Sequence, residues 1–243
     1  MTSSPSRPLV VSIVMPAYNE RPTIERAIRR CRETGLQMEI IVVDDCSKDG
    51  TAEIIDQLRA EGVVQCVIRH EHNKGKGAAV RAGMQAATGD VIVIQDADLE
   101  YDPADLPALL DPIRAGRADA VFGSRFQSGP RRVLYFWHSI GNRVLTLLSN
   151  MLTDLNLTDM ETCYKMIRAD LCKRLPLVSD RFGIEVELTA RLAQSGARIW
   201  EVPISYNGRT YAEGKKIDWR DGVAALWHIF RFNLFARRTP AAL

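Results

Sequence analysis

The sequence lacks several features that would place it in a special class of protein. Its charges almost cancel, with 32 Lys and Arg against 30 Asp and Glu among 243 residues, a net charge of +2. Nucleic-acid-binding proteins usually carry a basic excess, so we expect no nucleic-acid partner. The five cysteines form no C-x-x-C pair, so neither a zinc site nor a disulfide framework is indicated. Reduced thiols and a cytoplasmic location are expected.

Long apolar segments are also absent. No stretch reaches the roughly 18 apolar residues that a membrane-spanning helix requires. Residues 1–8 are polar and have no apolar centre, so they are interpreted as a disordered lead-in and not as a signal peptide. We therefore expect a soluble or peripheral protein.

What is present is an alternation of short apolar runs with segments of helical spacing. Runs rich in valine and isoleucine predict buried strands at 9–15, 38–43, 64–68, 91–94 and 120–122. Helices are predicted at 22–34, 51–61, 77–87 and 105–115, and later at 135–152, 184–193 and 217–235, with a strand at 199–204. This pattern predicts an α/β protein with a mostly parallel sheet, whose ligands bind at the carboxyl ends of the strands.

Acidic residues follow the fourth apolar run, where Asp96, Asp98 and Glu100 alternate. Two carboxylates two residues apart at a strand end point to the same side, and their repulsion is costly unless a cation offsets it. A hard cation such as Mg²⁺ or Mn²⁺ fits this pair and leaves sites for substrate phosphates. The alternative is a solvated acidic turn.

Two further segments follow strand ends. Asp44 and Asp45 could accept hydrogen bonds from a ribose or a base, although helix capping by Asp49 or Thr51 also accounts for this segment. The glycine-lysine segment 73–78 opens a helix, and helix N-termini favour phosphate. Its spacing matches neither the dinucleotide nor the P-loop fingerprint.

Taken in order, these motifs resemble the family 2 glycosyltransferases of GT-A fold. The matching segments are 16–20, 43–45, 47–51, 73–78, 96–98 and 123–125. Within that family, segments 159–165, 182–187 and 209–217 are similar to the polyprenyl-phosphate (dolichyl-phosphate) sugar synthases. The resemblance implies a Rossmann-like, mostly parallel sheet flanked by helices as a catalytic domain at 9–210. Residues 211–243 would form a C-terminal amphipathic helical extension associated with the membrane.

The resemblance also implies roles for individual residues. The nucleotide-sugar pocket would be formed by Pro16, Tyr18, Glu20, Asp45, Lys76, Asp96 and Ala97. Asp98 and Glu100 would hold Mg²⁺ or Mn²⁺ on the diphosphate. Phosphate groups of the acceptor or the donor would contact Arg125, Arg209 and Lys215.

The need for a protein base depends on the acceptor. Most inverting transferases use a carboxylate to deprotonate a hydroxyl, whereas a phosphate monoester is already largely ionised at neutral pH. Asp159, Glu161 and Glu185 are the base candidates for a hydroxyl acceptor; otherwise they would orient the sugar or the arginines. Structural alternatives are a loop cap for Asp159 and a first-turn helix acid for Glu185.

Two segments combine aromatic and basic residues, 135–152 and 217–238. Such helices suit a membrane interface, although each stripe could instead pack on the sheet. We expect an inverting, metal-dependent enzyme at the inner face of the cell membrane that moves a hexose or N-acetylhexosamine from a UDP-sugar to polyprenyl phosphate. The UDP preference is what the resemblance implies through the form of segment 209–217. Alternatives are GDP-mannose as donor, a soluble acceptor, and a non-catalytic sugar-nucleotide binder, and homo-oligomerisation is left open.

Overall fold

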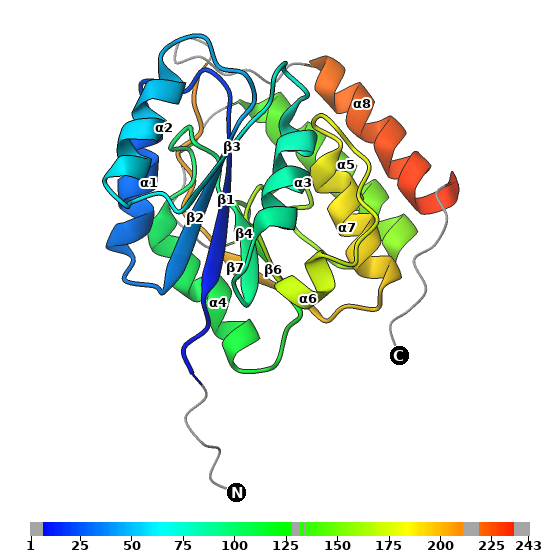
Figure 1. Ribbon diagram of the computed structural model, residues 1–243. Coiled ribbons are helices and arrows are strands. Elements are labelled where there is room, and N and C mark those ends of the chain that lie inside the picture. Colours follow the sequence, from blue (N-terminus) through cyan, green and yellow to red (C-terminus); the bar gives the residue numbers. More distant parts are fainter. Residues whose placement is uncertain (1–6, 128–131, 134, 211–218, 236–243) are drawn as a thin grey trace, which may run out of the picture.

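The computed structural model describes residues 7–127, 132–133, 135–210 and 219–235 (Figure 1). Within these ranges, strands of one sheet follow the order β3-β2-β1-β4-β6-β5-β7. Their bounds are β1 Val11–Ala17, β2 Met38–Asp44, β3 Cys66–Arg69, β4 Val91–Ile94, β5 Ala120–Ser124, β6 Lys165–Arg168 and β7 Ile199–Pro203. The pairs β1–β2, β2–β3, β1–β4 and β5–β7 are parallel, which confirms the predicted mostly parallel α/β sheet.

Strand β6 is the exception, because it runs antiparallel to both of its neighbours, β4 and β5. The sequence analysis predicted no strand here, since only Met166 and Ile167 separate Lys165 from Arg168. Lys165 is nevertheless fully buried, and its Nζ donates to the carbonyl oxygens of Met160 at 2.8 Å and Thr162 at 2.5 Å. The ammonium group is satisfied by backbone, so a basic residue fits inside a core strand.

Helices flank the sheet on both sides. They are α1 Ile24–Glu33, α2 Thr51–Ala60, α3 Lys76–Ala86, α4 Leu106–Arg114, α5 Phe136–Thr153, α6 Ala169–Cys172, α7 Ile184–Gln194 and α8 Trp219–Phe230, with a 3-10 turn η1 Pro103–Asp105 and a π-helical turn η3 Arg231–Phe235. In Figure 1, α1 and α2 lie to the left of the sheet, and α3, α5, α7 and α8 lie to the right. Because helices cover both faces of the sheet, the carboxyl ends of its strands are where a ligand could bind.

The core consists mainly of valine and isoleucine side chains from β1, β2 and β4, whose buried residues match the predicted apolar runs. Gly83 lets α3 approach β1 closely, because a Cβ at this position would lie 2.4 Å from Cγ1 of Val14. A second cluster joins α7 and α8 through Met160, Val186 and Ile229, with leucines of α5 packed against it. These contacts fix α5, α7 and α8 beside the sheet.

No helix in the described ranges combines the length and apolar content needed to cross a bilayer.

Candidate active site

The candidate site lies where β1, β2, β4 and β5 end. Asp45 directly follows β2, Asp96 lies two residues beyond β4, and Arg125 directly follows β5. Because parallel strands end at the same edge of a sheet, residues far apart in sequence meet there. Pro16 lies in β1, and the side chain of Tyr18 just beyond it is 41% exposed at the rim of this edge.

Asp45 holds the glycine-lysine loop that opens α3. Its two carboxylate oxygens accept the backbone N–H groups of Lys74 at 2.8 Å and Gly75 at 2.7 Å, and Nδ1 of His70 lies 2.6 Å from Oδ1. Burial works to raise the pKa of Asp45, but these hydrogen bonds outweigh it and lower the pKa below its usual value. Asp45 is therefore a structural anchor for the segment that precedes Lys76.

Lys76 begins α3 and joins two acidic residues from different parts of the chain. Its Nζ lies 2.8 Å from Oδ1 of Asp96 and 2.9 Å from Oε1 of Glu185, at the start of α7. Burial works to lower the pKa of Lys76, but Asp96, Cys163 and Glu185 raise it well above the ordinary value. The side chain therefore stays charged and ties the end of β4 to α7.

A second cation, Arg209, lies among three acids. Its NH2 is 2.7 Å from Oδ2 of Asp98, its Nε is 3.0 Å from Oε1 of Glu100, and its NH1 is 3.9 Å from Oε2 of Glu20. Burial, together with the charges of Asp96 and Glu100, raises the pKa of Asp98 to about 7, although Arg209 works to lower it. Negative charge at this strand end is thus only partly compensated.

The donor set of this cluster fits a hard divalent cation. Asp98 and Glu100 offer carboxylate oxygens, the ligands that Mg²⁺ and Mn²⁺ prefer, and excess negative charge favours a cation. The described residues contain no ready-made group of three such ligands, so further positions would come from substrate phosphates or water. Asp98 and Glu100 are the residues that would hold the ion.

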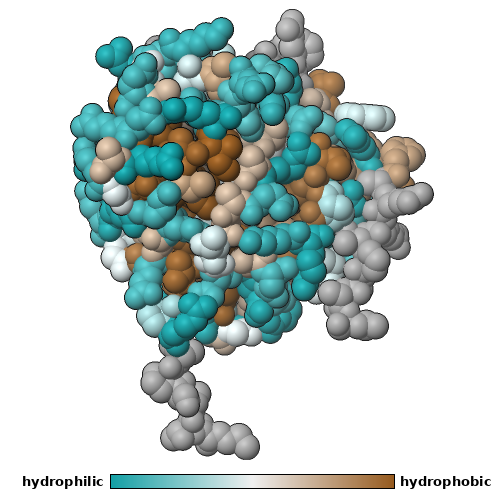
Figure 2. Space-filling model, viewed as in Figure 1, coloured by the Kyte–Doolittle hydropathy of each residue, from teal (hydrophilic) through white to brown (hydrophobic). Residues whose placement is uncertain are grey.

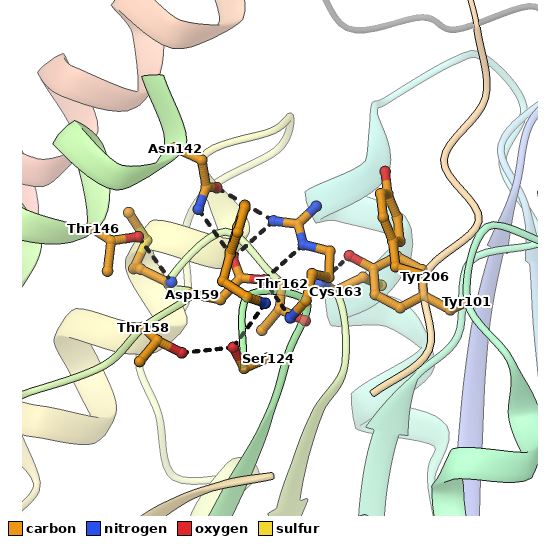
Figure 3. Close-up of polar contacts among 12 residues, drawn as sticks. Tyr101, Ser124, Asn142, Thr146, Thr158, Asp159, Thr162, Cys163 and Tyr206 are labelled. Atoms are coloured by element: carbon orange, nitrogen blue, oxygen red, sulfur yellow. Dashed lines mark hydrogen bonds and ion pairs between the residues drawn. The ribbon is translucent and has the colours of Figure 1, made fainter. Parts of the chain in front are cut away.

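A third cation, Arg125, pairs with a fully buried acid (Figure 3). Its Nε and NH2 contact the two oxygens of Asp159 at 2.7 and 2.8 Å, and its backbone N–H also donates to Asp159 at 3.1 Å. Asn142 of α5 contacts both partners at 3.3 Å. Both oxygens of Asp159 are therefore occupied, and the carboxylate fixes the guanidinium in one orientation.

Tyr206 connects the arginine clusters and was missed by the sequence analysis. Its hydroxyl donates to Oε2 of Glu100 at 2.7 Å, and the guanidinium of Arg125 lies 5.2 Å from its ring centre. Tyr101 packs against the same ring at 5.5 Å between centroids, and its hydroxyl accepts the backbone N–H of Cys163 at 3.0 Å (Figure 3). The one available signal was the position of Tyr206 shortly after a predicted strand. A tyrosine in that place usually packs in a core, so the position alone does not indicate a site residue.

Glu161 differs from the other acids. Among the described residues, its Oε1 is buried and has no hydrogen-bond partner. Burial and the nearby charge of Glu185 raise the pKa of Glu161 to about 7. Lys165 holds the carbonyls of Met160 and Thr162 on either side of it, so the loop that carries Glu161 is fixed.

The last two predicted site residues are Ala97 and Lys215. Ala97 is buried beside Asp96, and Lys215 lies outside the described residues. The structure thus brings Glu20, Asp98 and Glu100 together, and separately joins Asp96 to Glu185 and Arg125 to Asp159.

Comparison with known proteins gives consistent results. The model of the family "Glycosyl transferase family 2" matches residues 12–175. The chain is 33% identical to undecaprenyl-phosphate mannosyltransferase of Micrococcus luteus, covering 93% of this chain and 95% of that protein. It is 30% identical to dolichol-phosphate mannosyltransferase of Pyrococcus furiosus, covering 84% of this chain and 58% of that protein.

Among solved structures, glucosyl-3-phosphoglycerate synthase of Mycobacterium tuberculosis, bound to Mn²⁺, UDP and glucosyl-3-phosphoglycerate, shares the fold. The TM-score is 0.72, at 20% identity, over 97% of this chain and 88% of that chain. The expected GT-A fold is therefore confirmed. With the family match spanning most of the described sheet, the chain belongs to glycosyl transferase family 2 and is a glycosyltransferase.

Proposed function

We propose that this glycosyltransferase moves a hexose from a nucleotide diphosphate sugar to polyprenyl phosphate. The observation that carries the proposal is the pairing of two of the three base candidates: Asp159 with Arg125, and Glu185 with Lys76. A hydroxyl acceptor needs a carboxylate that is free to accept its proton, whereas an ionised phosphate needs cations that position it. The undecaprenyl-phosphate mannosyltransferase similar to this chain supports the same acceptor class.

The residues of the site support a division of tasks. Lys76 would keep Asp96 and Glu185 oriented toward the donor sugar, and Arg125 would attract the acceptor phosphate. A bound divalent cation would neutralise the negative charge that develops on the leaving diphosphate. Asp98 and Glu100 would hold that cation, and Asp45 would maintain the loop beside the nucleotide.

For the donor, we favour mannose, and hence GDP-mannose, because two similar proteins are named as mannosyltransferases. A UDP-sugar stays the second candidate, since the family resemblance of segment 209–217 implies it. Labelled GDP-mannose, UDP-glucose, UDP-N-acetylglucosamine and UDP-N-acetylgalactosamine should be incubated with the enzyme, polyprenyl phosphate and Mg²⁺ or Mn²⁺. Product from one donor identifies the sugar; absence of lipid-linked product from every donor would refute the proposal.

Glu161→Gln separates lipid phosphate from a hydroxyl acceptor. Glu161 is the base candidate whose oxygen lacks a partner within the described part of the chain. With a phosphate acceptor, we expect this variant to keep turnover within about tenfold; with a hydroxyl acceptor, loss of the general base would cost about 10²–10⁴ in kcat. A loss of that size would contradict the proposed acceptor.

The proposal includes contact with a membrane surface at the cytoplasmic side. Helices α5 and α8 pack together, and each keeps apolar side chains exposed. The exposed set consists of Phe136, Trp137, Val144, Leu147 and Met151 on α5, and Val223, Trp227 and Phe230 on α8. Figure 2 shows apolar surface over α8. Exposed Arg143 and Arg231 lie on or next to these helices and would attract anionic lipid.

A further inference from the structure

In the acidic cluster around Arg209, the guanidinium of Arg209 lies where a cation would be expected. Glu20, Asp98 and Glu100 are largely buried, with side chains 12%, 15% and 14% exposed, and they share the guanidinium of Arg209. When all three acids are ionised, one positive charge faces three negative charges. The cluster then retains a net negative charge, which attracts a further cation.

The contacts of Arg209 use the same oxygens that a metal would use. Its NH2 donates to Oδ2 of Asp98 at 2.7 Å, and both its Nε and its backbone N–H donate to Oε1 of Glu100, at 3.0 and 3.1 Å. Mg²⁺ binds carboxylate oxygens at about 2.0–2.1 Å. An ion on these oxygens would lie within about 5 Å of the guanidinium, and in a partly buried site this repulsion is large.

The surroundings of Arg209 hold Glu100 and the backbone in place independently of the guanidinium. The hydroxyl of Tyr206 donates to the other oxygen of Glu100, Oε2, at 2.7 Å. The backbone N–H of Asn207 donates to the carbonyl oxygen of Glu100 at 2.9 Å, and Tyr206 forms an isolated bridge with Tyr101. The other oxygen of Asp98, Oδ1, accepts the backbone N–H of Glu100 at 3.1 Å. The Arg209 side chain can therefore leave the cluster while Asp98 and Glu100 keep their positions.

We propose that Arg209 acts as a positioning residue that takes the place of the divalent cation in the free enzyme and leaves when the cation binds. The released guanidinium then becomes available to phosphate oxygens of the substrates. This inference rests on the proposed function for the metal-binding role of Asp98 and Glu100. It explains how a site with excess negative charge keeps its geometry before the donor arrives.

The test measures metal binding without donor or lipid, so it is independent of the donor screen. Free Mn²⁺ is counted by electron paramagnetic resonance in titrations of the full chain and of Arg209→Gln. We expect Mn²⁺ to bind about tenfold or more tightly to Arg209→Gln than to the unmodified protein, because the competing charge is gone. Arg209→Lys, which keeps the charge but loses the two-point contact, should lie between them.

Arg26→Gln is the matched control. Arg26 is exposed, lines the same cavity of about 250 Å³ as Glu100, and has no hydrogen bond to the three acids among the contacts described. Removing its charge should change Mn²⁺ affinity by about twofold or less, as for other screened surface charges. Equal Mn²⁺ affinity in Arg209→Gln and the unmodified protein, with near-ultraviolet circular dichroism showing both folded, would overturn the proposal.

A second measurement follows the side chain itself. With ¹⁵N-labelled arginine, Mg²⁺ should shift the Nε–H resonance of Arg209 in proportion to the ion bound, and leave that of Arg26 unchanged. An Arg209 resonance that stays in place when Mg²⁺ saturates the protein would refute the exchange of one cation for the other.

Discussion

At the scale of single residues, the site is a set of carboxylates that share a few largely buried cations, with side chains 16–20% exposed. Lys76 forms ion pairs with Asp96 and Glu185, and Arg125 forms one with Asp159. Arg209 forms ion pairs with the acids of the candidate metal site. Breaking a buried ion pair by removing one partner is costly, because the other charge stays buried without compensation. Substitution of a single cation in this site is therefore expected to lower the stability of the protein.

Lys76→Met tests this linkage. It leaves Asp96 and Glu185 without their shared counter-ion, so we expect the free energy of unfolding to fall by about 3–5 kcal/mol. Urea denaturation at pH 7 measures this change. Lys48→Met, at a residue with an exposed backbone hydrogen bond only, serves as the control and should change stability by less than about 0.5 kcal/mol. Equal stability of the two variants would show that the buried pair contributes nothing.

Asp98→Asn tests the metal role. The substitution keeps the shape of the side chain but removes the charge that would hold the cation. Since a bound cation would stabilise the leaving diphosphate by several kcal/mol, turnover should fall by about a hundredfold or more. Asp102→Asn, in the same loop but paired with Arg30 at 2.7 Å, should retain activity. A fully active Asp98→Asn enzyme would exclude a metal at this position.

At the scale of elements, the conformation of the glycine-lysine loop and of the start of α3 depends on Asp45 and on two glycines, Gly75 and Gly77, which have no side chain. Gly75 has a φ of +97°, and a Cβ there would lie 2.4 Å from the carbonyl oxygen of Asp180. Gly77 is equally close to its neighbours, since a Cβ would lie 2.3 Å from the carbonyl oxygen of Ser179. The loop before α7 thus packs directly on the loop before α3.

Gly77→Ala is expected to separate these two loops. Because the clash is with backbone, the methyl group cannot be accommodated by a side-chain rotation, and we expect a loss of about 1–3 kcal/mol in stability together with weaker donor binding. Gly62→Ala is the control: Gly62 has a φ of +74° but open space around its Cβ, so only backbone strain of about 1 kcal/mol applies. Thermal unfolding and donor titration distinguish the variants.

Asp45→Asn gives a pH dependence with a defined sign. The pKa of Asp45 is lowered in the folded protein, so its ionised form contributes stability above the unfolded value of 3.8, and that contribution is lost as the pH falls through the folded pKa. Asp45→Asn should therefore be less stable than the unmodified protein at pH 7, by about 1–3 kcal/mol. The difference should shrink below pH 4. A difference that is constant from pH 7 to pH 3 would contradict this assignment.

Sequence patterns predicted the elements with strong local signals and missed those that depend on tertiary contacts. The apolar runs identified β1, β2 and β4, and helical spacing identified α5 and α7. The sequence analysis did not identify β6, because its burial follows from backbone acceptors for a lysine and not from an apolar run. The positions of Asp96, Asp98 and Glu100 after a predicted strand were enough to place these acids at the candidate site. Their pairing with particular cations could not be predicted, because it depends on loops that meet only in the folded chain.

At the scale of the whole molecule, apolar surface is distributed unevenly. Helices α5 and α8 direct some apolar residues inward, including Leu148 and Ile229, and keep a second set exposed. The inward set packs among α5, α7 and α8, and the exposed set is the surface that the membrane proposal concerns. Exposed tryptophans beside basic residues are typical of proteins that bind at the interface of a bilayer.

Trp137→Ser and Trp227→Ser should weaken binding to vesicles. These side chains are 78% and 59% exposed, so the changes should leave stability nearly unaltered while removing apolar contact with lipid. Sedimentation with vesicles containing anionic lipid measures the effect. Trp200→Ser is the matched control, because Trp200 is 39% exposed on β7, where the guanidinium of Arg117 lies 4.4 Å from its ring. If Trp200→Ser weakens vesicle binding as strongly, the assignment to α5 and α8 is wrong.

The antiparallel strand β6 has a consequence for synthesis of the chain. It separates β4 from β5 in the sheet, yet β4 ends at Ile94 and β6 begins only at Lys165. On the ribosome, one edge of β4 therefore stays unpaired while the intervening segment, including β5 and α5, is translated. Unpaired strand edges promote aggregation, so nascent chains that stop before Lys165 should depend on chaperones far more than slightly longer ones.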